Sequence, residues 1–329
     1  MNNLIEKIVR LLLISFLLVG YEVDAQQLPL YSQHVMNKYL INPAVAGSGG
    51  YTQINLTARE QWIGIKDSPK THALSIHSRI LRNSFISKTF AIRRNQKSSL
   101  RDGRVGLGAY IFNDRSGLIS RTGFQFTYAY HINIQEGQLS FGLSGNIYQF
   151  KLDQQEMRSY EPDDATLNYA RGTTLIPDAD FGVYFANQSM YVGFSTAYLF
   201  QSAFKFGNQG YKNFRLKRHH YLVGGYNHEL NSNIRIEPNL MMKLSESPRF
   251  QMDLGTNIYF YENYWGGLAY RTGGALIIMG GVKVDKFYFG YAFDYTFINL
   301  MRHSFGSHEF MLAMKLGENA RRYRWLKSY

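Results

Sequence analysis

Apolar and polar residues alternate one by one along most of this chain, the pattern of β-strands with one apolar face. Between Leu139 and Ile147, Leu, Phe, Leu, Gly and Ile occupy the odd positions, and Ser, Gly, Ser and Asn the even ones. Residues 234–244 and 250–260 alternate in the same way, and each stretch is 11 residues long. A tilted membrane strand needs about 9–11 residues, whereas strands of soluble sandwiches have about 5–6. The length therefore favours membrane strands.

About fourteen such segments can be counted, and bacterial outer-membrane barrels have an even number of strands. They begin near Tyr51, Lys70, Arg104, Arg121, Gly137, Asp178, Met190, Arg218, Ile234, Arg249, Asn263, Ala275, Asp285 and Ser307. The predicted fold is all-β, a transmembrane antiparallel β-barrel of about 14 strands that covers residues 49–316.

The connections between these segments differ in length. Tight turns are expected at residues 134–136, 187–189, 231–233, 262–263 and 284–285, and longer links at 150–177, 199–217 and 296–306. Outer-membrane barrels have short periplasmic turns and longer extracellular loops. The longer links are therefore expected outside the cell, and both termini in the periplasm.

The N-terminus has the order of a secretory signal peptide. Lys7 and Arg10 precede an apolar run from Leu11 to Val19, and Val23 and Ala25 place small residues at the −3 and −1 positions of a cleavage site. The apolar run is too short to cross a bilayer comfortably as a helix, which needs about 20 residues. We therefore expect residues 1–25 to be a signal peptide and export to the outer membrane to follow.

Composition agrees with this fold class. The chain contains 25 Tyr, 23 Phe and 30 Gly, which suits many strands joined by turns, with aromatic rings at the membrane interfaces. It has no Cys, so disulfides and thiolate-bound metals are excluded. The net charge of +12 would suit nucleic acid, but an exported protein rarely meets it, so no nucleic-acid partner is expected.

Basic residues are concentrated in two places. Residues 81–103 should lie on the periplasmic side, and the basic tail at 317–329 falls on the same side. The 81–103 segment is either a solvated or disordered loop, or a docking surface for an acidic periplasmic partner. The docking residues would be Lys88, Arg93, Arg94, Lys97 and Arg101.

One outer loop is also basic. Residues 205–218 contain no acid, which suggests contacts with lipopolysaccharide phosphates. The candidate outer-loop contacts are Lys205, Lys212, Arg215 and Lys217.

The residues form no recognisable catalytic or metal-binding pattern. Neither an HExxH nor a GxSxG sequence occurs. The adjacent His219 and His220 would point to opposite faces of a strand and could not bind one metal together. We therefore expect a protein that is not an enzyme, with no catalytic residues, no cofactor and no metal.

Short motifs in order along the chain resemble one known family. They are Leu28–Gln33, Ile41–Gly47, Arg59–Gly64, Phe112–Asp114, Tyr128–Ile132, Leu139–Leu143, Tyr270–Gly273, Asp294–Tyr295 and Gly306–Phe310. As a set they resemble the PorP/SprF family of type IX secretion system membrane proteins of Bacteroidetes. The family-motif residues singled out are Asn42, Pro43, Gly47, Gln61, Trp62, Asn113, Asp114, Ser307, His308 and Glu309.

The resemblance implies a non-enzymatic outer-membrane barrel of the type IX secretion and gliding apparatus. It also implies a partner, a secreted surface protein of the adhesin type with a C-terminal sorting domain, whose export or retention the barrel supports. Further partners would be secretion components in the periplasm and the outer membrane. The architecture alone would equally support a diffusion channel or a transporter of hydrophobic solutes.

The segment before the first strand, residues 26–48, has its own signature. Asn42-Pro43 favours a turn, because Pro fixes φ and pushes the preceding residue towards extended geometry. Gly47, Gly49 and Gly50 then permit a reversal into the first strand. We expect this segment to fill the periplasmic mouth or the lumen, because a barrel of about fourteen strands is wide enough to leak.

The basic segment yields a first prediction. Reversing the charge of the five candidate docking residues, Lys88 to Arg101, should abolish co-purification of an acidic periplasmic partner, because like charges then face each other. The measurement is affinity purification from native membranes with mass spectrometry. Unchanged co-purification would mean that the segment is a solvated loop.

Overall fold

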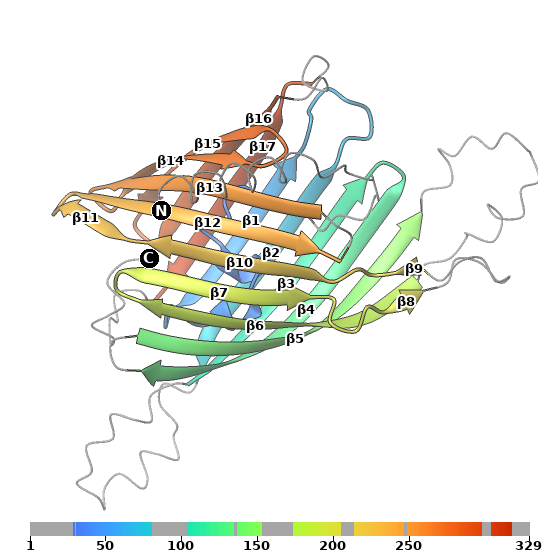
Figure 1. The fold of residues 1–329 in the computed structure, drawn as a ribbon, viewed down its shortest axis with the longest axis horizontal. Coiled ribbons are helices and arrows are strands. Elements are labelled where there is room, and N and C mark those ends of the chain that lie inside the picture. Colours follow the sequence, from blue (N-terminus) through green and yellow to red (C-terminus); the bar gives the residue numbers. More distant parts are fainter. Residues whose placement is uncertain are drawn as a thin grey trace, which may run out of the picture.

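The computed structural model describes residues 29, 31–80, 104–134, 137–152, 174–204, 214–246, 249–297 and 304–317. In these ranges the chain forms one large antiparallel sheet that closes on itself (Figure 1). β10 and β11 are two pieces of one wall strand, because both pair with β12 and only Asn227 separates them. The fifteen elements of the sheet therefore make a barrel of fourteen strands, as the alternation predicts.

The elements have the following bounds. The first half of the wall contains β1 (Thr52–Glu60), β2 (Lys70–Ile80), β3 (Val105–Ser116), β4 (Ile119–Ile134), β5 (Gly137–Leu152), β6 (Thr174–Asn187) and β7 (Met190–Ala197). The second half contains β10 (His219–Tyr226) with β11 (His228–Asn231), β12 (Ile234–Ser245), β13 (Arg249–Phe260), β14 (Tyr264–Arg271), β15 (Ala275–Val284), β16 (Phe287–Thr296) and β17 (Ser307–Leu316). A separate hairpin pairs β8 (Ala203–Phe204) with β9 (Phe214–Arg215). The starts agree with the predicted ones, and the largest difference is at β6, which begins at Thr174 rather than Asp178.

Two independent pairings close the barrel. β1 pairs with β17 from Thr52–Leu316 to Glu60–His308, and β10 pairs with both β7 and β12. Each wall strand therefore has hydrogen-bonded neighbours on both sides. Closure of this kind removes sheet edges, which lipid could not solvate.

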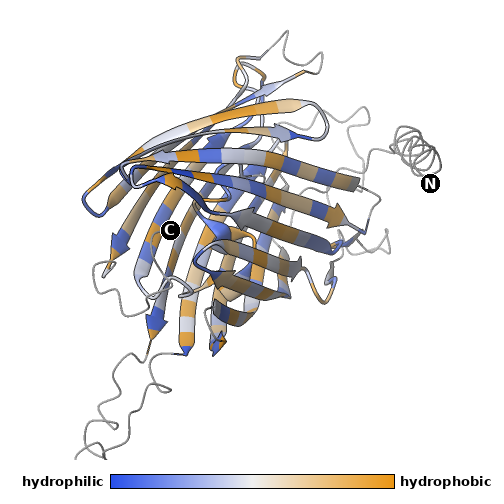
Figure 2. Cartoon of the chain, turned by 60° about the vertical axis from the view of Figure 1, so that its left-hand side comes forward, coloured by the Kyte–Doolittle hydropathy of each residue, from blue (hydrophilic) through white to orange (hydrophobic). Residues whose placement is uncertain are grey.

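The outer face of the wall is apolar. Residues such as Leu143, Leu254, Leu268 and Phe310 stand outward and are more than half exposed. Their strand neighbours face inward, and polar and apolar residues alternate along the arrows in Figure 2. An apolar exterior over a polar interior is the arrangement of a transmembrane barrel. Among the described residues, no helix is long and apolar enough to cross a membrane.

The two ends of the barrel differ. At one end, named here the short-turn end, β4–β5, β6–β7, β11–β12, β13–β14 and β15–β16 are joined by links of two or three residues, and Thr52 lies beside Leu316. The opposite, long-loop end carries the links between β5 and β6, between β7 and β10, and between β16 and β17. It also has tight turns, between β3 and β4 at Gly117 and between β14 and β15 at Gly273, where positive φ allows a sharp reversal. The asymmetry between the ends is thus weaker than the loop lengths suggested.

Residues 31–50, named here the lumenal segment, lie inside the barrel. They include two short 3₁₀ helices, η1 (Lys38–Leu40) and η2 (Pro43–Val45), and most of their side chains are buried. The wall leaves room for them at inward glycines. A Cβ at Gly142 would collide with the backbone of Pro43 and Ala44, and one at Gly106 with the Ala46 carbonyl group. The segment and the wall therefore fit each other at backbone distance.

This fit predicts the effect of one methyl group. Gly142→Ala should displace the lumenal segment, because backbone atoms cannot rotate away, at a cost of about 1–3 kcal/mol. The chain has no cysteine, so Val35→Cys can report the displacement through its rate of modification by a water-soluble maleimide. We expect faster modification in Gly142→Ala. Gly145→Ala on the same strand is the matched control, because its new methyl meets no atom within 4 Å. Equal rates in the two variants would contradict the fit.

Candidate functional site

Five charged side chains converge inside the barrel against the start of the lumenal segment. We name them the lumenal ion network, and they are Arg59 on β1, Asp253 on β13, Arg271 on β14, Asp294 on β16 and Glu309 on β17. Each occupies an inward position of its strand, and its neighbours along the strand point to the other face. The alternation therefore decides which face each side chain occupies, and the closure of the barrel brings them together.

The network is continuous through hydrogen-bonded ion pairs. Arg59 Nη2 lies 2.7 Å from Asp294 Oδ2, and Arg59 Nη1 lies 3.2 Å from Glu309 Oε2. Arg271 links Asp294 to the remaining carboxylate, at 3.0 Å from Asp294 Oδ2 and 2.7 Å from Asp253 Oδ2. Charge-assisted bonds of this kind are shorter and stronger than those between neutral groups.

The network holds the lumenal segment by its backbone. The amide nitrogens of Ser32 and Gln33 donate to the two oxygens of Glu309, at 2.7 and 2.9 Å. The Ser32 hydroxyl donates to Asp294 at 2.8 Å and accepts from Arg59 Nη1 at 2.7 Å. The network contains two guanidinium groups and three carboxylates, so these amide donors offset the surplus negative charge.

Burial makes the network costly to disturb. Arg59 and Glu309 are each 1% exposed, and Asp294 is 2% exposed. Removing one partner of a buried pair costs about 3–5 kcal/mol, because the remaining charge is left uncompensated. The network therefore imposes one position on the start of the segment.

Other side chains of the segment form hydrogen bonds with several wall strands. The hydroxyl groups of Tyr31 and Tyr110 lie 2.7 Å apart, and those of Tyr39 and Thr127 lie 2.8 Å apart. Asn42 Nδ2 donates to the Val183 carbonyl oxygen at 3.0 Å. These bonds reach β3, β4 and β6, so the segment is anchored at many points of the circumference.

The turn at the end of the segment is bonded as well. Gly47 has a φ of +72°, its amide donates to His77 Nδ1 at 3.1 Å, and its carbonyl accepts from Arg79 Nε at 2.9 Å. The Ala46 carbonyl oxygen lies 2.9 Å from His131 Nε2. The chain then leaves the lumen for β1.

His34 adds no charge to the network. Burial is the main cause that lowers the pKa of His34 to about 4. Asp253 has a smaller effect that raises this pKa, and Arg271 has a smaller effect that lowers it further. The imidazole is therefore neutral at neutral pH.

The family-motif residues fall into two groups in the structure. The first group is lumenal and comprises Asn42, Pro43, Gly47, Asp114 and Glu309. Asn42 also caps η2, because its Oδ1 accepts from the Ala44 amide at 2.9 Å. Asp114 pairs with Arg121 at 2.6 Å and accepts from Thr71 at 2.7 Å.

The second group lies at the long-loop end or on the outer face. Gln61 and Trp62 begin the link from β1 to β2, and the Trp62 amide, at a positive φ, donates to Ser307 Oγ at 3.2 Å. His308 faces outward and lies 2.7 Å from the Tyr291 hydroxyl. Asn113 also faces outward and donates to Thr122 at 2.9 Å. The motif therefore marks two separate places rather than one site.

The candidate docking residues Lys88, Arg93, Arg94, Lys97 and Arg101 lie outside the described residues, as do Lys205 and Lys212, the signal peptide and nearly all of the tail. Arg215 is exposed on β9, and Lys217 follows it. The structure thus places two of the four outer-loop candidates at the long-loop end.

Sequence reasoning did not select Arg59, Asp253, Arg271, Asp294 or Ser32 as site residues. A signal was present for the charged ones, because each interrupts an alternating strand at an inward position. The sequence could not predict which of them form pairs, because Arg59 and Asp294 are 235 residues apart.

The arrangement holds the start of the lumenal segment against the wall. The charges of the network pair with one another, and the one surplus carboxylate is offset by the backbone amides that it binds. Over the described part of the chain, no group of three or more His, Asp or Glu residues could hold a metal ion.

One family model and several solved structures resemble this chain. A family model described as type IX secretion system membrane protein PorP/SprF matches residues 23–314. No curated protein matches the chain. Among solved structures, a deltaS2 mutant of the TodX monoaromatic hydrocarbon channel is 10% identical, with 85% of this chain and 92% of that chain covered and a TM-score of 0.41. The outer membrane protein Omp33 from Acinetobacter baumannii is 7% identical, with 82% and 99% covered and a TM-score of 0.40. Both likenesses are distant.

The ion network predicts a large loss of stability from a single substitution. Glu309→Ala should lower the free energy of unfolding by about 3–5 kcal/mol, because Arg59 and two backbone amides lose their acceptor. Urea unfolding of the barrel in lipid vesicles measures this loss. Glu229→Ala removes an exposed acid on β11 and should change stability by less than about 0.5 kcal/mol. Similar values for both variants would show that the network does not carry the stability assigned to it.

Proposed function

This chain belongs to the PorP/SprF family of type IX secretion system membrane proteins, and from that premise we propose that it binds a secreted surface protein and supports its export or retention. It is an integral β-barrel of the outer membrane. The proposed client is of the adhesin type and carries a C-terminal sorting domain. The barrel acts as an anchor and secretion partner, without catalysis.

The occupied lumen is the observation that carries this proposal. The lumenal segment forms hydrogen bonds with wall strands on both sides of the β1–β17 pair, from β16 and β17 to β1 and on to β6. Several of these bonds go to the buried charged side chains of the ion network. A diffusion channel needs a continuous water path, and a segment anchored at so many points narrows that path. The occupied lumen therefore favours a partner-binding barrel over the alternative of a channel or hydrophobic-solute transporter.

The long-loop end offers a surface for the client. Phe200, Phe297 and Phe305 are 73%, 62% and 77% exposed, and all three lie where strands give way to loops at this end. Exposed aromatic side chains are common at the centres of protein interfaces. The loops around them, 150–177, 199–217 and 296–306, are the proposed contact region, since recognition in barrels usually uses exposed irregular segments.

Other partners belong to the same proposal. Arg215 and Lys217, together with Lys205 and Lys212, would contact lipopolysaccharide phosphates at the long-loop end. The basic 81–103 segment would face periplasmic components of the secretion system at the short-turn end.

Removing one outer loop tests client binding. The β8–β9 hairpin stands apart from the wall sheet, and the Leu216 amide donates to the Ser202 carbonyl oxygen at 3.3 Å, so a short linker can replace residues 203–215 without disturbing β7 or β10. We expect the variant to assemble normally and to lose most of its co-purifying surface protein. The measurement is affinity purification from native membranes with mass spectrometry.

A replacement of equal kind at the opposite end is the control. Exchanging residues 231–233, the tight turn between β11 and β12, should leave the yield of surface protein unchanged. Recovery of the barrel alone from wild-type membranes, together with permeability of reconstituted liposomes to small solutes, would favour the channel instead.

A further inference from the structure

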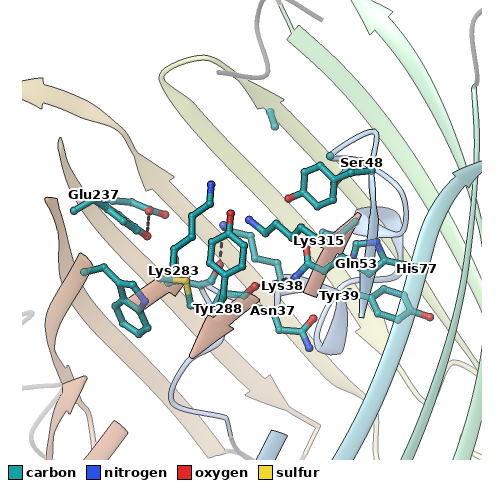
Figure 3. Close-up of a pocket in the computed structure, with 18 of the residues that line it drawn as sticks. Asn37, Lys38, Tyr39, Ser48, Gln53, His77, Glu237, Lys283, Tyr288 and Lys315 are labelled. Atoms are coloured by element: carbon teal, nitrogen blue, oxygen red, sulfur yellow. Dashed lines mark hydrogen bonds between the residues drawn. The ribbon is translucent and has the colours of Figure 1, made fainter. Parts of the chain in front are cut away.

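A cavity of about 110 Å³ lies at the short-turn end, between the lumenal segment and the wall (Figure 3). Its floor is buried and includes Asn37, Tyr39, Glu237 and Trp265. Its rim is more exposed and includes Glu262 and other residues next to the tight turns. The cavity belongs neither to the ion network nor to the long-loop surface.

Basic groups dominate the lining. It contains four basic side chains, Lys38, Arg235, Lys283 and Lys315, against two acidic ones, Glu237 and Glu262. The ammonium groups of Lys315 and Lys283 lie 4.3 and 5.3 Å from the centre of the Tyr288 ring. Figure 3 shows Lys283 and Lys315 beside Tyr288, and the ammonium group of Lys38 lies 4.2 Å from the centre of the Tyr191 ring in the same part of the barrel. Two ammonium groups over one ring, with two further basic side chains in the lining, create a positive potential that attracts an anion.

Buried polar atoms in the same lining lack partners. Within the described part of the chain, Trp265 Nε1, Glu237 Oε1 and Asn37 Oδ1 have no hydrogen-bond partner. Leaving such groups unsatisfied costs about 1–3 kcal/mol each. The residues that line the cavity thus contribute one buried N–H donor and two buried acceptors, to which a ligand that reaches the floor would supply partners.

A peptide with an acidic side chain complements this set. Its carboxylate would accept from Trp265 and face the lysines, and its backbone N–H groups would donate to Asn37 and Glu237. Inorganic phosphate supplies the charge but few donors. The volume agrees, because an apolar cavity of about 150 Å³ holds one benzene molecule. The space therefore takes one side chain with its adjoining amide, and not a folded domain.

We propose that this cavity binds an acidic peptide segment presented at the periplasmic, short-turn end of the barrel. The site is separate from the client surface at the long-loop end. Peptide binding at the cavity therefore does not depend on whether the proposed client binds.

The test is a titration of the full barrel in detergent with acetyl-Glu-Glu-amide. Trp265 fluorescence reports occupancy in a background where Trp62 and Trp325 are replaced by Phe, since the chain has 3 Trp. We expect acetyl-Gln-Gln-amide and inorganic phosphate to bind much more weakly. Lys283→Gln and Lys315→Gln should each weaken binding of the acidic peptide about tenfold, or about 1.4 kcal/mol.

Two further variants test whether the charge of the lining determines the affinity for the acidic peptide. Glu237→Gln keeps an acceptor oxygen but removes a negative charge from the floor, so it should tighten binding of the acidic peptide. Lys286→Gln removes a lysine from the neighbouring turn, outside the lining, and should leave binding unchanged. Heat-modifiable gel mobility shows which variants are folded.

Several results would overturn the proposal. They are equal binding of the acidic and neutral peptides, phosphate binding as tight as peptide binding, and an effect of Lys286→Gln as large as that of Lys315→Gln. Peptide binding that appears only after truncation behind Gly317 would assign the cavity to the terminal residues of this chain. Weaker binding in Glu237→Gln would also contradict the assigned charge.

Discussion

An irregular backbone inside a barrel must find its hydrogen bonds in the wall, and the rest of this structure depends on that constraint. The lumenal segment has two single-turn helices and several turns, which satisfy many of its amide and carbonyl groups, and the wall has to supply partners for others. Non-helical backbone at membrane depth is tolerated where protein surrounds it. Here Glu309 accepts two consecutive amides, and His131 and Arg79 lie against consecutive carbonyl groups at the opposite end of the segment.

The charges of the wall follow from the same constraint. A carboxylate that receives backbone amides in a buried place needs a counter-charge, and Arg59 supplies it. Arg59 also pairs with Asp294, which in turn pairs with Arg271 and through it with Asp253. The network therefore joins five strands of the wall to one end of the segment. The inward glycines complete the fit, since Gly106 and Gly142 bring the wall to backbone distance where no ion pair is made.

The lumenal segment lies between the two ends of the barrel, and each end presents its own surface. The segment occupies the lumen, which supports a role in partner binding rather than in passage of small solutes. The long-loop end presents exposed aromatic rings, whereas the short-turn end has a small cavity with basic and aromatic walls. The two surfaces differ in chemistry, so the two proposed partners would be recognised independently.

The sequence by itself determined the barrel, because the alternation of apolar and polar residues in each strand shows which side chains face lipid. The alternation located the fourteen wall strands and the tight turns of the short-turn end, and the ordered motifs pointed to the PorP/SprF family. The tertiary structure alone decided which inward residues meet. Arg59, Asp294 and Glu309 are far apart in the chain, and no local pattern encodes their pairing. The path of residues 31–50 was likewise decided by the closed wall, since an irregular segment has no periodicity and takes its conformation from the groups that surround it.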